Sequence, residues 1–131
     1  MKTKKVLAGL FIVCLILSTL ALAETKEFSF AVVPTPSAQE YQVGARASKA
    51  DSEQRFYVTT TSNGFPDKRA MFYISCNDNG KFISNTVKNS GNATYKETAT
   101  AGQYHKLAYR TARKSSDPET MCYVVKGRWT P

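Results

Sequence analysis

The sequence predicts an all-β protein, a single antiparallel β-sandwich or small barrel of about eight short strands. Three observations predict this fold class. Apolar and polar residues alternate with a period of two through most of the chain after residue 24. No stretch in that part sustains the apolar spacing of an amphipathic helix. Clusters of glycine, asparagine and proline interrupt the alternation about every 10 to 12 residues, as turns between short strands would.

The first half of the chain contains four alternating segments. In the first of them Phe28, Phe30 and Val32 alternate with small residues until Pro34 ends the pattern. The third is rich in aromatic and β-branched residues, which fit a pleated, half-buried surface. The four expected strands cover residues 28–32, 41–47, 55–61 and 70–75.

The second half of the chain adds four more segments. Residues 77–80 read Asn-Asp-Asn-Gly, a strong turn signal, and predict a hairpin between the strand before them and the segment after them. In the last segment Tyr123 and Trp129 are six positions apart and therefore share a face. These four expected strands cover residues 82–87, 93–100, 104–111 and 120–129.

Residues 1–23 have the three parts of a secretory signal peptide. A positive start containing Lys2, Lys4 and Lys5 is followed by an apolar run and by the small-residue ending Ala-Leu-Ala. We therefore expect cleavage after residue 23, a single secreted β domain over residues 24–131, and no transmembrane anchor after cleavage. The expected location of the protein is extracellular.

Cysteine usage agrees with an oxidising compartment. Three cysteines occur, and one of them lies in the signal, which leaves Cys76 and Cys122. An isolated pair in an exported chain predicts a disulfide bond, which would stabilise the fold by about 4 kcal/mol in the chain-entropy model. The alternation poses a conflict, because Cys122 has the opposite parity to Tyr123. Either Val124 faces the core, or a bulge at Gly127 shifts the register, or the disulfide lies at the rim of the sheet.

The residues offer little for catalysis, and we expect no enzyme activity, no metal site and no cofactor. A structural zinc site needs four ligands. After residue 23 the chain offers only two cysteines, 46 positions apart, and one histidine. That histidine, His105, has the pattern of an exposed or half-buried strand residue. No serine or cysteine nucleophile can be paired with a base from the sequence.

Basic residues gather in the last 26 positions. After position 23 the chain has 15 basic and 10 acidic residues, a net charge of +5, which is too small to indicate nucleic-acid binding. These cations are interleaved with aromatic residues, a combination that suits acidic wall polymers, carbohydrates or anionic surfaces. The aromatic residues are Tyr104, Tyr109, Tyr123 and Trp129. The alternative is that the aromatic residues fill the core and the cations keep the protein soluble. The candidate binding face comprises Lys106, Arg110, Arg113, Lys126 and Arg128.

Three segments carry a resemblance to a known family: Phe28-Ser-Phe30, residues 41–46, and the ending Val-Lys-Gly-Arg-Trp-Thr-Pro over residues 125–131. Together they are similar to a bacterial family of small secreted β proteins that is classed only as a domain of unknown function. The resemblance covers residues 26–131, and the Gly-x-Trp-x-Pro ending is its most specific part. It implies an exported protein of Gram-positive type and assigns no catalytic residue.

Two functional hypotheses follow. The first is a secreted, non-catalytic, surface-associated β-sandwich that binds a wall polymer or carbohydrate. The alternative is a cationic secreted effector, a bacteriocin-like toxin or inhibitor. The pattern favours a buried Trp129, because an aromatic residue in this final strand needs packing to hold it in place; the other option is an outward binding platform.

Overall fold

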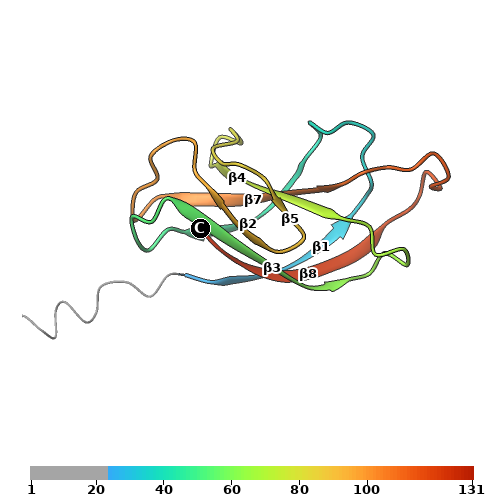
Figure 1. Ribbon diagram of the computed structural model, residues 1–131, viewed down its shortest axis with the longest axis horizontal. Helices are drawn as coiled ribbons and strands as arrows, with labels where there is room; N and C mark the ends of the chain where they lie inside the picture. The colour runs from blue at the N-terminus through green and yellow to red at the C-terminus, as the bar shows by residue number, and fades with distance from the viewer. Residues whose placement is uncertain (1–23) are drawn as a thin grey trace, which may run out of the picture.

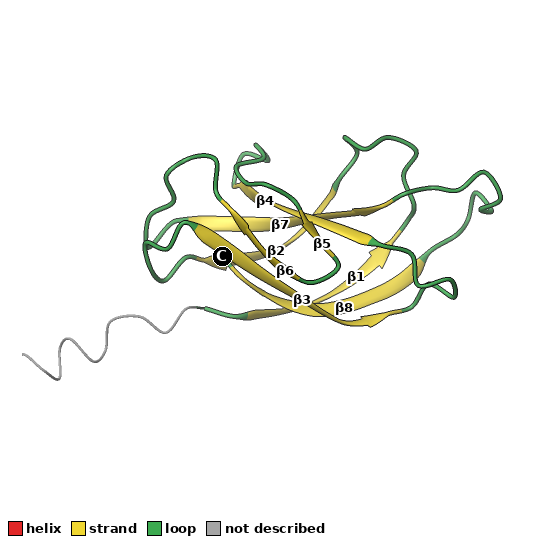
Figure 2. Cartoon of the chain, in the orientation of Figure 1, coloured by secondary structure: helices red, strands yellow, loops and turns green. Residues whose placement is uncertain are grey.

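The computed structural model describes residues 24–131 as two packed layers of β-strands (Figure 1). The expected signal peptide, residues 1–23, lies outside the described residues. The described chain is all-β, as Figure 2 shows. Its eight strands are β1 (Lys26–Val32), β2 (Gln42–Ser48), β3 (Arg55–Asn63), β4 (Met71–Asn77), β5 (Val87–Lys88), β6 (Gly91–Thr94), β7 (Tyr104–Thr111) and β8 (Tyr123–Thr130).

The strands form two antiparallel sheets of four. One sheet has the order β1-β8-β3-β6, and the other has the order β2-β7-β4-β5. Consecutive strands mostly cross from one sheet to the other, so that β7 and β8 each lie inside a sheet, between strands from distant parts of the sequence. The predicted fold class is therefore confirmed as a small β-sandwich.

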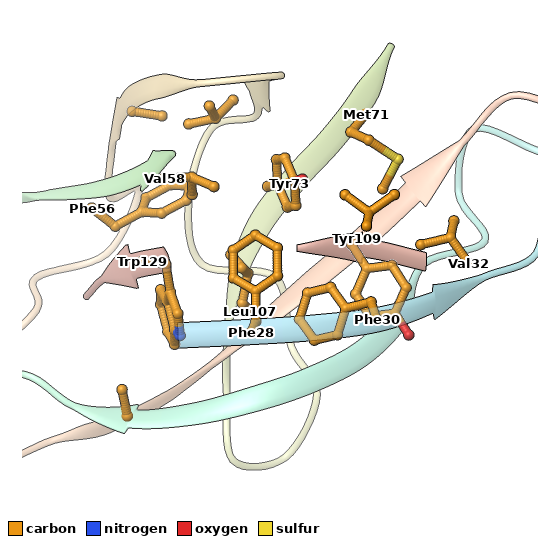
Figure 3. Packing of buried hydrophobic residues seen from close by; sticks show 14 of the residues in the cluster. Phe28, Phe30, Val32, Phe56, Val58, Met71, Tyr73, Leu107, Tyr109 and Trp129 are labelled. Atoms are coloured by element: carbon orange, nitrogen blue, oxygen red, sulfur yellow. The ribbon is translucent and has the colours of Figure 1, made fainter. Parts of the chain in front are cut away.

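The hydrophobic core lies between the sheets, where the alternating residues point inward. Phe28, Phe30 and Val32 are buried, while the residues between them are exposed. Phe30 stacks on Tyr109 across the sandwich (Figure 3). Their ring centroids are 3.9 Å apart. Trp129 is 1% exposed, which confirms the buried alternative for this residue.

The expected strands 82–87 and 93–100 are much shorter in the structure, where β5 covers two residues and β6 ends at Thr94. The segment 82–87 makes only isolated bridges before the two-residue β5, although the turn at residues 77–80 forms as expected. The cause lies partly in Ser84, whose hydroxyl accepts a hydrogen bond from the amide of Ser75 and donates one to the carbonyl of Asn85. Such side-chain bonds replace ladder bonds and interrupt the strand.

The predicted disulfide is wrong, because both cysteines are free thiols. Cys76 lies in β4 on the side of its sheet that faces away from the core, where it packs with Ile74 and Ala108. Cys122 is exposed just before β8, which belongs to the other sheet. The parity conflict therefore reflects two thiols that face outward from different sheets. Of the alternatives, Val124 does not face the core, since it is 46% exposed. A bulge does occur beside Gly127, but it lies in the neighbouring β3, between Thr60 and Ser62.

We expect the two thiols to differ in reactivity. Under native conditions iodoacetamide should label Cys122 alone, because Cys76 is 0% exposed and burial raises the pKa of its thiol. Mass spectrometry of the chain 24–131 should show one adduct natively and two in denaturant. Dithiothreitol should leave the melting temperature unchanged. If the denatured chain took up iodoacetamide only after reduction, the two cysteines would be disulfide-bonded and the free-thiol assignment would be wrong.

Candidate functional site

The two sheets divide the predicted binding residues between opposite faces of the molecule. Lys106 and Arg110 point outward from β7 in one sheet. Lys126 and Arg128 point outward from β8 in the other sheet, where they alternate with buried residues. Arg113 is exposed in the loop after β7. The five residues therefore do not form one face, and each sheet has to be considered by itself.

Aromatic side chains cover the outer surface of the sheet β2-β7-β4-β5. Tyr41 packs over Ile74, Cys76 and Ala108 at the centre of this surface. Phe82 meets the edge of the Tyr41 ring at a centroid distance of 5.2 Å and is 40% exposed. We call this surface the aromatic–cationic face and define it by Tyr41, Arg46, Phe72, Phe82, Lys88, Tyr104, Lys106 and Arg110.

Arg110 occupies an unusual position in the aromatic–cationic face. It is 7% exposed, and its guanidinium lies 6.0 Å from the ring of Tyr41 and 5.7 Å from that of Phe72. Within residues 24–131 its guanidinium makes two hydrogen bonds, both long at 3.4 and 3.5 Å, to the hydroxyl and carbonyl of Thr35. No carboxylate among residues 24–131 forms an ion pair with it. A cation this deeply placed is usually paired, so Arg110 retains the capacity to bind an anion.

The other end of the face is held by an ion pair. Arg46 donates two hydrogen bonds of 2.9 Å to the carboxylate of Asp78, and its guanidinium stacks 3.7 Å from the ring centroid of Tyr104. The carboxylate and its partner are both exposed, so the pair positions these groups more than it stabilises the fold. Lys106 donates to the carbonyl of Asp78 and forms no ion pair within the described residues.

The opposite sheet presents a different surface. Lys126 and Arg128 border a shallow groove of about 420 Å³ that also includes Ser29 and Thr61. Glu27 lies directly opposite Arg128 in the β1–β8 register, so a negative charge accompanies the cations. This groove contains no exposed aromatic ring, because the ring of Phe28 is buried beneath Gly127. Its chemistry is less suited to sugars or to an anionic polymer than that of the aromatic–cationic face.

A buried polar cluster lies inside the sandwich and corrects the expectation for His105. This histidine is 1% exposed, because it points inward from β7. Its Nδ1 atom lies 3.2 Å from the hydroxyl of Tyr95 and 3.4 Å from that of Ser75. Lys49, also buried, forms an ion pair with Asp51 at 3.1 Å. Burial, with a smaller contribution from the charge of Lys49, lowers the pKa of His105.

The Ser75–His105 contact places a hydroxyl beside a base, which the sequence did not suggest. Ser75 is fully buried in the core, and its hydroxyl is out of reach of a substrate. The cluster therefore acts as a polar part of the core. Among residues 24–131 no three potential metal ligands gather into one group.

Sequence reasoning missed Arg46 as a partner of Lys106 because of a bulge in β2. The register shifts between Gly44 and Arg46, and Ala45 takes a left-handed φ of 43°. Val43 and Arg46 therefore face the same side, although strict alternation separates them. The shift leaves no sequence signal, since alanine is not a residue that favours this conformation. Tyr41, Phe72 and Lys88 were missed because the sequence does not show which strands are neighbours.

No family model, curated protein or solved structure matches this chain. The part of the chain that the structure describes has no helix long and apolar enough to cross a membrane.

Proposed function

We propose that the protein is a secreted, non-catalytic binding protein whose aromatic–cationic face binds an anionic cell-wall polymer. The observation that carries the proposal is Arg110, a nearly buried guanidinium between two aromatic rings with no carboxylate partner among residues 24–131. Its charge complements phosphate or carboxylate groups of a polymer. The exposed rings of Phe82 and Tyr104 complement the apolar faces of the sugar units.

The geometry of β7 suits an extended chain. Tyr104, Lys106 and Arg110 all point outward from this one strand, so the row extends for about 20 Å at the usual strand rise. Lys88 adds a cation beside Phe72 on the far side of β4. A polymer with repeated anionic groups can therefore meet several cations and aromatic rings along one line.

We expect the double variant Lys88→Glu/Lys106→Glu to lose about tenfold or more in affinity for purified Gram-positive cell wall, a loss of about 1.4 kcal/mol. The change replaces two cations of the aromatic–cationic face by carboxylates. The matched control is Lys126→Glu/Arg128→Glu, which makes the same change in charge on the opposite sheet. Co-sedimentation at physiological salt measures both variants.

The control should stay within about twofold of the unchanged protein, because its cations lie away from the proposed site. Equal losses in both variants would show that net charge alone drives binding and would overturn the assignment of the face. Recovery of the unchanged protein entirely in the unbound fraction would overturn the function. Growth inhibition of neighbouring species without wall retention would favour a cationic effector instead.

A further inference from the structure

A small pocket opens at the end of the sandwich where β4 ends and β7 begins. Its volume is about 290 Å³, close to the lower end for ligand pockets and suited to a single ring. Asn77 and His105, which lie opposite each other in the β4–β7 register, both line it. Tyr104, which is 48% exposed, is also among the lining residues and belongs to the aromatic–cationic face.

Amide groups in the lining have unused donors. The side-chain oxygen of Asn77 accepts hydrogen bonds of 3.0 Å from the amides of Asn79 and Lys81, which fixes the orientation of the carboxamide. The side-chain oxygen of Gln103 likewise accepts from the amide of Thr100 at 3.0 Å. The NH₂ groups of Asn77 and Gln103 donate to no residue in the described chain. Each is thus a positioned donor beside the pocket.

His105 supplies a buried group with one nitrogen unused. Its Nδ1 is shared by the hydroxyls of Tyr95 and Ser75, whereas Nε2 has no hydrogen-bond partner among residues 24–131. Trp129 Nε1 is the fully buried side-chain atom without a partner in the described chain, so Nε2 of His105 keeps some accessible surface beside the pocket and can hydrogen-bond to an occupant. Because burial lowers the pKa of His105, the ring is neutral at neutral pH and adds no cation to the pocket.

Carboxylates complete the lining. Asp78 is held by Arg46, and Glu97 is held by Lys81. Each ionised carboxylate has more acceptor sites than its partner uses, so both can accept hydrogen bonds from hydroxyl groups. Their charge also disfavours an anion here, in contrast to the region around Arg110.

We propose that this pocket binds one neutral sugar ring. Such a ring offers hydroxyl donors to Asp78 and Glu97, and hydroxyl acceptors to the amides of Asn77 and Gln103. Its apolar face can pack against Tyr104. The inference rests on the proposed function, since it names a neutral unit of the polymer and places it beside the cations that would bind the charged units.

The single histidine of the chain gives a direct test, because the only histidine ring signals in an NMR spectrum belong to His105. N-acetylglucosamine and glucose are each titrated into the labelled chain 24–131. We expect at least one of them to shift the His105 ring signals saturably, with a Kd of about 1–10 mM. The variant Gln103→Ala should weaken binding about fivefold or more. The control Gln39→Ala changes the same residue type in an exposed loop away from the pocket.

If neither sugar shifted the His105 ring signals at concentrations up to about 100 mM, ten times the upper expected Kd, the inference would be overturned. Equal weakening in Gln103→Ala and Gln39→Ala would overturn it too, since binding would then lie elsewhere. Both probes are neutral and do not report on Arg110 or Lys106. Failure of wall retention with intact sugar binding would therefore contradict the proposed function alone, and the reverse result would contradict the pocket alone.

Discussion

Replacing Trp129 by alanine should destabilise the protein by about 4 kcal/mol. The indole is 1% exposed, and β8 lies inside its sheet between β1 and β3. Trp129 is opposite Val58 in β3 and in the same core cluster as Phe28 and Phe56 (Figure 3). Truncation therefore leaves a large cavity in a place where two ladders hold the backbone and limit collapse. For a domain of about 100 residues this loss is a substantial part of a stability of about 5–15 kcal/mol.

Thermal and urea unfolding followed by circular dichroism measure the effect, because the variant has no tryptophan fluorescence. The melting temperature should fall by about 15 °C or more. Trp129→Phe keeps an aromatic ring and removes the indole Nε1, which has no hydrogen-bond partner within residues 24–131, so this substitution should cost less stability than Trp129→Ala. Arg128→Ala, at the exposed neighbouring position, should change stability by less than about 0.5 kcal/mol. A loss at Trp129→Ala no larger than that of Arg128→Ala would contradict the packing argument.

The sequence predicted where strands lie and which side chains face the core, wherever one side of a strand is buried and the other is in contact with solvent. β1 and β8 have this property, and their buried residues alternate as expected. The expected strand 104–111 has the same bounds as β7. Such patterns are local, since the period of two alone decides which side chains face the core. The same logic identified Trp129 as a core residue.

The sequence could not predict which strands pair with each other, because strand pairing depends on contacts between distant parts of the chain. β7 and β8 follow each other in sequence but belong to different sheets, so the basic residues of the candidate face separate. The disulfide failed for the same reason, since Cys76 and Cys122 belong to strands or strand ends of different sheets. His105 was misjudged because a buried imidazole needs partners, here Tyr95 and Ser75, that are identified only by the fold.

Replacing Gly127 by alanine should destabilise the protein by about 3 kcal/mol, at the upper end for overpacking. A Cβ atom at this position would lie 2.2 Å from the carbonyl oxygen of Thr59 and 2.5 Å from Cζ of Phe28. The first atom belongs to the backbone of β3, which pairs with β8 at this point and cannot rotate away. The added methyl group therefore has to push β3 from β8 or displace the Phe28 ring from the core. Urea unfolding measures the loss.

A second substitution separates the two contacts. Phe28→Leu in the Gly127→Ala background removes the contact with the ring and leaves the contact with Thr59, so rescue should be partial at most. Phe28→Leu alone provides the reference for a double-mutant cycle. The matched control is Gly80→Ala, in the turn after β4, where a Cβ would meet no atom within 4 Å. The Gly80→Ala substitution should lower the stability by only about 1–2 kcal/mol, because alanine is strained in a left-handed backbone and the φ of Gly80 is +81°. If Gly127→Ala cost no more than Gly80→Ala, the close approach of β3 and β8 at Gly127 would not constrain the fold.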